Sequence, residues 1–133
     1  MLNSMTILIF DGSGYSSLDL SEAIEESDGR VAGPVATLSE TVTILDSIAV
    51  GGAIVDCELP GASEVVMLLA ERDVPLVIQT SVALPQSLGD LGERASVLTR
   101  PVDPRTLLET LLVEVGRSEL RASNMLGPIP QGV

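Results

Sequence analysis

Hydrophobic residues recur along the chain in short runs rich in branched side chains, with polar stretches between them. Five such runs are present, at residues 7–10, 31–32, 53–55, 76–78 and 97–98. Runs of this length are typical of buried β-strands, and their starts lie 24, 22, 23 and 21 residues apart. Each gap has room for one helix. The pattern therefore predicts five successive strand–helix units.

The first three gaps carry helix signals. A helix is expected from about residue 16 to residue 27. A second is expected to begin at Thr37, because Thr37 and Glu40 have the spacing of a capping box ahead of an apolar stripe. Ser63 is the expected N-cap of a third helix. These helices are amphipathic, so each is expected to cover one face of the sheet.

The fourth gap and the segment after the fifth run differ in how strongly they predict a helix. Proline and glycine interrupt the segment at residues 84–91, so a short, weak helix is expected there. Asp103 followed by Pro104 is a strong helix start, and five apolar residues behind it predict a broad buried face. Residues 121–133 contain two prolines, two glycines and no periodicity. We therefore expect one domain over residues 1–120 and a flexible tail over 121–133.

The strands themselves indicate the order of the sheet. The first, third and fourth runs are almost entirely apolar, as in parallel strands covered by helices on both faces. The second run ends in Gly33-Pro34, which favours an edge position. The predicted fold class is α/β: a five-stranded doubly wound parallel sheet of order 2-1-3-4-5, flavodoxin-like, in three α/β/α layers. Ligands of such sheets bind at the carboxyl ends of the strands, near the switch point between strands one and three.

Charge and composition disfavour or exclude several classes of function. The chain has 133 residues and a net charge of −12, which disfavours contact with nucleic acid or anionic membranes. It contains no histidine, so histidine-dependent nucleophile pairs and the usual zinc clusters are excluded. There is no signal-peptide pattern or membrane-length apolar segment, and Cys57 is the only cysteine. A cytoplasmic location is expected, with Cys57 packed as a small hydrophobe.

Chemically active side chains follow four of the five strands. Asp11 comes after the first, Asp56 and Glu58 after the third, Thr80 after the fourth and Arg100 after the fifth. The carboxyl ends of parallel strands share one edge, so these residues are expected to converge. Two or three carboxylates suit Mg²⁺, and a hydroxyl and a cation beside a carboxylate suit a phosphoryl group. Asp56 is the predicted functional centre.

This arrangement resembles the receiver domain of bacterial two-component response regulators, which has the fold of the chemotaxis response regulator. The resemblance covers roughly residues 5 to 116 and rests on five segments in the family's order: residues 7–11, 53–56, 59–61, 75–80 and 97–101.

The resemblance implies roles for particular residues. Asp56 is implied to accept a phosphoryl group from a histidine kinase or phosphotransfer protein. Asp11 and Asp56, with help from Glu58, are implied to hold Mg²⁺ in a weakened site. Thr80 is implied to be the switch hydroxyl, and Arg100 stands where the family has a lysine. Catalysis is limited to the domain's own phosphorylation and dephosphorylation, so the chain is not expected to be an enzyme.

Three departures qualify this interpretation. Gly12 replaces the second acid of the metal-binding pair, Arg100 replaces the lysine, and Val97 replaces the aromatic switch residue. Arginine is planar and bidentate, so it is not a neutral replacement for lysine. Paired permanently with Asp56 or Glu58, it would hold the domain in one state without phosphate.

Two functions follow, and simpler interpretations stay open. The first is an atypical receiver that is phosphorylated on Asp56 and then changes a protein interface. The second is a degenerate receiver that binds a downstream protein, or a second copy of itself, independently of phosphorylation through its fourth and fifth helices and the strand between them. A flavin or nucleotide role for the loop at residues 11–16 is a third alternative, disfavoured because the chain has few aromatic residues. Asp11 as a turn residue, Thr80 as a plain strand end and Arg100 as a surface cation are the simpler interpretations.

Overall fold

The computed structural model describes the backbone of residues 2–12, 14–81 and 95–125, and side chains there except at 14–16 and 121–125. Strands and helices alternate through β4, as the hydrophobic pattern predicts. In chain order they are β1 (Thr6–Phe10), α1 (Gly14–Glu26), β2 (Arg30–Val35), α2 (Leu38–Ser47), β3 (Gly52–Asp56), α3 (Ala62–Glu71), β4 (Leu76–Thr80), β5 (Ala95–Thr99) and α4 (Pro104–Met125). The helix expected at residues 84–91 lies outside the described residues.

The five strands form one parallel sheet in the order β2-β1-β3-β4-β5. The predicted order is confirmed, including the edge position of β2. The Gly33-Pro34 pair lies within β2, and the pairing of β1 with β2 shifts register between Leu8 and Phe10. The proline lacks a backbone donor, so an edge strand with an irregular ladder tolerates it.

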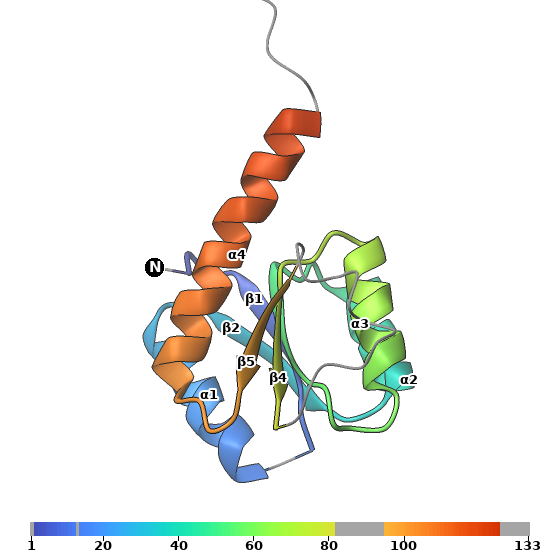
Figure 1. The fold of residues 1–133 in the computed structure, drawn as a ribbon, viewed down its shortest axis with the longest axis vertical. Coiled ribbons are helices and arrows are strands. Elements are labelled where there is room, and N and C mark those ends of the chain that lie inside the picture. Colours follow the sequence, from blue (N-terminus) through green and yellow to red (C-terminus); the bar gives the residue numbers. More distant parts are fainter. Residues whose placement is uncertain (1, 13, 82–94, 126–133) are drawn as a thin grey trace, which may run out of the picture.

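Helices cover both faces of the sheet (Figure 1), because alternate residues of each central strand point to opposite sides. Leu8 and Val55 face the side covered by α2 and α3, where they pack with Val66 and other buried residues. Ile9 and Ile54 face the side covered by α1 and α4. Both faces are therefore apolar cores, which explains why the central strands have no polar alternation.

The helix starts confirm one predicted cap and correct another. Thr37 caps α2: its Oγ1 accepts the Glu40 backbone N–H at 3.1 Å, while Glu40 Oε1 accepts the N–H of Ala36, the residue before the cap, at 3.3 Å. The predicted Ser63 cap of α3 is wrong. That helix begins at Ala62, and Gly61 occupies the N-cap position with φ +83° and no side-chain hydrogen bond. The left-handed conformation explains the glycine.

Helix α4, the fifth helix predicted from the sequence, is longer than its apolar pattern indicates. Asp103 caps it, accepting the Thr106 N–H at 2.9 Å, and the helix continues to Met125. In Figure 1 its C-terminal half extends beyond the sheet. The first five residues of the predicted tail are thus helical, and the other eight lie outside the described part of the chain. Searched over its described residues, the chain has no helix of the length and apolarity needed to span a membrane.

Candidate functional site at the carboxyl edge of the sheet

The parallel sheet brings the predicted site residues to one edge. Asp56 is the last residue of β3 and Thr80 the last residue of β4, while Asp11 and Arg100 directly follow β1 and β5. Backbone hydrogen bonds hold the strand ends in register: the Cys57 N–H donates to Gln79 at 2.9 Å, and the Arg100 N–H donates to Thr80 at 2.9 Å. Asp11, Asp56 and Thr80 are buried.

Arg100 is the centre of the site's electrostatics. Its Nη2 lies 3.1 Å from Asp56 Oδ2, and its Nη1 lies 3.1 Å from Glu58 Oε2. The two Nη groups therefore serve two different carboxylates, which the planar fork of a guanidinium permits. Asp56 is the more enclosed acid, because its side chain is 11% exposed and that of Glu58 is 35% exposed.

The loop after β3 completes this network. The Glu58 backbone N–H donates to Asp56 Oδ1 at 3.0 Å, so both oxygens of Asp56 are engaged. Ser81, just beyond β4, donates its hydroxyl to Glu58 Oε2 at 3.2 Å. The Glu58 side chain thus points toward the site. The sequence interpretation assigned no role to Ser81, although its position directly after Thr80 places it at the same edge of the sheet.

Cys57 lies between the two paired acids and is half-buried. Burial raises the pKa of its thiol, and the nearby charges of Asp56 and Glu58 raise that pKa further. A raised pKa favours the neutral thiol over the reactive thiolate. The packing partners of Cys57 belong to the core under α2 and α3, which agrees with its expected role as a small hydrophobe.

Two of the three predicted metal ligands, Asp56 and Glu58, are paired with Arg100. In the part of the chain that the structure describes, no group of three or more acid, cysteine or histidine side chains is placed to hold a metal ion. The second acid position is Gly12, where a Cβ atom would lie 2.8 Å from Leu59 Cδ2, so an acid at this position requires the end of the Leu59 side chain to shift. The weakened Mg²⁺ site at Asp11, Asp56 and Glu58 thus stays a prediction.

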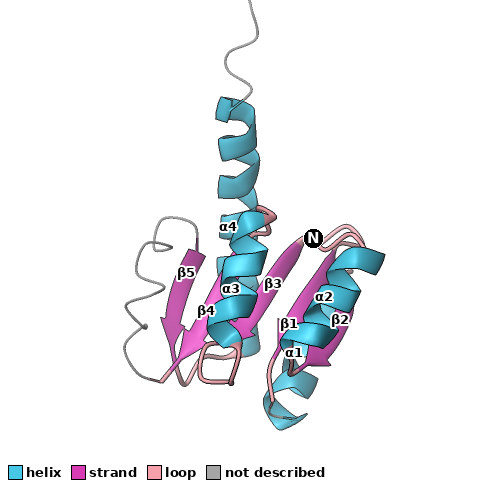
Figure 2. Ribbon diagram, turned by 90° about the vertical axis from the view of Figure 1, so that its right-hand side faces the viewer, coloured by secondary structure: helices cyan, strands magenta, loops and turns pink. Residues whose placement is uncertain are grey.

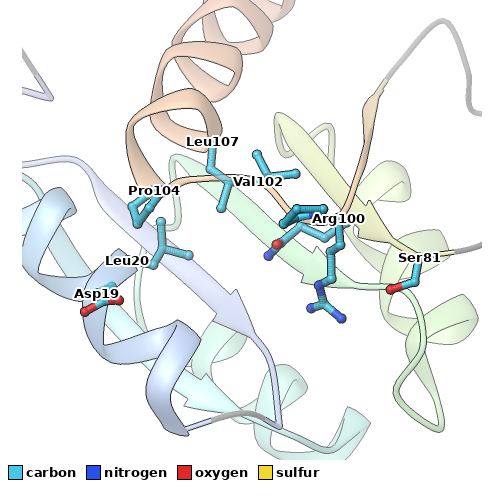
Figure 3. Close-up of a pocket in the computed structure, with 9 residues that line it drawn as sticks. Asp19, Leu20, Ser81, Arg100, Val102, Pro104 and Leu107 are labelled. Atoms are coloured by element: carbon cyan, nitrogen blue, oxygen red, sulfur yellow. The ribbon is translucent and has the colours of Figure 1, made fainter.

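A cavity of about 500 Å³ adjoins the ion pairs. Figure 3 shows Leu20, Val102 and Leu107 on one side of it, with Arg100 and Ser81 across from them. Asp19 on α1 and Gln79 on β4 also line it. The cavity gives a small group access to the Arg100 side chain.

Several solved structures that superpose on this chain are receiver domains of response regulators. A response regulator receiver protein from Sinorhizobium medicae superposes with a TM-score of 0.74 at 18% identity, covering 89% of this chain and 99% of that one. A receiver domain protein from Methanospirillum hungatei gives 0.75 at 20% identity, with 88% and 98% covered. No protein-family model matches the chain, and no curated protein matches it.

A third similar structure was solved in a phosphorylated form. It is a response regulator protein from Burkholderia pseudomallei with a phosphorylated aspartic acid, a calcium ion and citrate, at a TM-score of 0.69 and 14% identity, covering 94% of this chain and 76% of that one. The predicted resemblance of the fold is thereby confirmed: this chain has the fold of response regulator receiver domains.

Proposed function

We propose that the chain is a receiver-type regulatory domain that acts through protein–protein contact and does not depend on phosphorylation. The observation that carries the proposal is the double ion pair of Arg100 with Asp56 and Glu58, both at 3.1 Å. The guanidinium offsets one of the two negative charges and joins the loop after β3 to the residue after β5. It therefore supplies a counter-charge to Asp56 in the absence of a phosphoryl group.

The charge balance supports this proposal. Asp11, Asp56 and Glu58 bring three carboxylates to this edge of the sheet, and Arg100 is the cation that pairs with Asp56 and Glu58. A phosphoryl group adds further negative charge to this edge of a chain whose net charge is −12. Without an assembled metal site, that charge is costly to bring in.

The proposed contact face is formed by β5 and α4, together with the helix predicted before β5. Val97 on β5 is 37% exposed and Val113 on α4 is 53% exposed, so each carries apolar surface available for a partner. The partner is a downstream protein or a second copy of this chain.

A second candidate is phosphorylation of Asp56 by a histidine kinase or phosphotransfer protein. It is favoured by the cavity beside Arg100 and by the position of Asp56 at the switch point of the sheet. In that reaction an Asp56 oxygen attacks the phosphorus of a phosphohistidine, a P–O bond forms, and the P–N bond breaks to release the imidazole. In the structure Arg100 and the Glu58 N–H each engage one oxygen of Asp56, so attack uses a remaining lone pair of one of these oxygens.

Amide chemical shifts separate the two candidates. Beryllofluoride with Mg²⁺ imitates a phosphoryl group on aspartate, and it is titrated into the isotope-labelled chain. The first candidate predicts unchanged amide signals at Cys57, Glu58 and Ser81. Saturable shifts at these amides, lost in Asp56→Ala, would support the second candidate and overturn the first.

A further inference from the structure

A surface groove lies between α2 and α3, on the outer side of these helices. Leu38 and Val42 line it from α2, and Met67 and Leu68 line it from α3, enclosing about 490 Å³. Figure 2 shows the two helices side by side over one face of the sheet. Ser63, Glu64 and Glu71 complete the lining.

Helix α3 has apolar side chains on two faces, and only one of these faces packs against the sheet. Val65, Val66 and Leu69 are fully buried in the core. Met67, in contrast, is 46% exposed, and Leu38 across the groove is 37% exposed. Neighbouring apolar side chains left in water on both walls of a groove form a continuous surface that gains free energy when a partner covers it. Methionine adapts its shape to different apolar partners.

The charges on the rim indicate the chemistry of that partner. Glu64 and Glu71 are the charged residues of the lining, and they lie seven positions apart, about two helical turns or roughly 10 Å, with Met67 between them. Neither forms a salt bridge with a described residue. The nearby pair of Arg72 and Asp46, at 3.0 Å, joins the C-terminal ends of the two helices. The rim is thus negative, and the net charge of the chain repels an acidic partner.

We propose that the groove between α2 and α3 binds an amphipathic helix of a partner protein, with apolar side chains facing Leu38 and Met67 and with lysine or arginine two turns apart facing Glu64 and Glu71. A groove between two helices can bind a third helix. The bound helix places apolar side chains in the groove at positions i, i+3 or i+4, and i+7. This surface does not involve Asp56, so it is independent of the proposed function above.

The test uses a synthetic helical peptide with a leucine stripe and lysines two turns apart, and a matched peptide with glutamate at the lysine positions. Each is titrated into the isotope-labelled full chain, and amide shifts are mapped. The lysine peptide is expected to shift amides of α2 and α3 and to bind more weakly as salt is raised. The Met67→Lys variant is expected to weaken its binding by a factor of about ten or more.

Leu18→Lys is the matched control, because Leu18 is 58% exposed on α1 and the substitution makes the same change of charge and polarity on the opposite side of the sheet. It is expected to change affinity by less than about a factor of two. Circular dichroism confirms that both variants are folded. Equal binding of the glutamate peptide, equal weakening by the two variants, or absence of shifts in α2 and α3 would overturn the proposal. So would self-association of the chain that Met67→Lys abolishes, because a second copy would then occupy the groove.

Discussion

Arg100 Nη2 lies 3.1 Å from Asp56 Oδ2, a carboxylate whose side chain is only 11% exposed. The same guanidinium contacts Glu58 through its other Nη group. An ion pair in this position is shielded from water more than a pair on the outer surface. The chain offers a direct comparison in Arg72 and Asp46, whose nitrogen–oxygen distance is 3.0 Å but whose side chains are 40% and 60% exposed.

Replacing each arginine by methionine is expected to show that the two ion pairs contribute differently to the free energy of unfolding. Arg100→Met leaves an enclosed carboxylate without its cation and is expected to lower the free energy of unfolding by about 1 to 3 kcal/mol. Arg72→Met is expected to lower it by less than about 1 kcal/mol, because both groups are solvated. Urea denaturation at constant m-value measures the difference. Equal losses in the two variants would show that Arg100 does not stabilise the site as described.

The alkylation rate of the Cys57 thiol depends on the charges in the same loop. Because burial, Asp56 and Glu58 all raise the pKa of its thiol, alkylation by iodoacetamide at about pH 8 is expected to be slower than for cysteine in an unfolded peptide. Glu58→Gln removes one of these charges, so its rate profile is expected to move to lower pH. The control is the rate in urea, where native and variant chains are expected to agree. An unmoved profile in the folded variant would contradict the assignment.

The cap of α4 gives a pH-dependent prediction. Hydrogen bonds from the Thr106 backbone N–H and hydroxyl lower the pKa of Asp103 below its ordinary value of 3.8. A lowered pKa in the folded state means that the ionised cap stabilises the fold above the unfolded pKa, and that this contribution is lost as pH falls through the folded pKa. The Tm of the native chain is therefore expected to exceed that of Asp103→Asn at about pH 6, and the difference to shrink below pH 3.8. Other acids are common to both proteins and cancel. A difference that is constant with pH would contradict this account.

Much of the fold follows from local sequence. The β-branched runs, the Gly33-Pro34 pair and the capping box at Thr37 are each determined by residues close in the chain, and the structure confirms what they predict. The start of α3 was not predictable in this way, because the left-handed Gly61 depends on the path of the loop from β3. Glu114 is a further case. It is fully buried at the i+7 position from Leu107 and accepts the Ser96 hydroxyl at 2.6 Å, although its residue type indicates a surface position.

Some features of the candidate site can likewise be predicted from the sequence and others cannot. Topology alone places Asp11, Asp56, Thr80 and Arg100 at one edge, so the sequence predicts their convergence. It does not predict that Leu59 lies over Gly12 or that Ser81 donates to Glu58, because both contacts depend on how two loops pack together. These loop contacts decide whether the acids form a metal site or an ion-pair network.

Intact mass after incubation with acetyl phosphate and Mg²⁺ tests the central claim most directly. The native chain is expected to keep its mass, because Arg100 engages Asp56 and the second acid position holds a glycine. The double variant Gly12→Asp, Arg100→Lys restores the residue types of phosphorylated receivers, and it is expected to gain the mass of one phosphoryl group, which Asp56→Asn in that background removes. A native chain that gains one phosphoryl group on Asp56 would contradict the account.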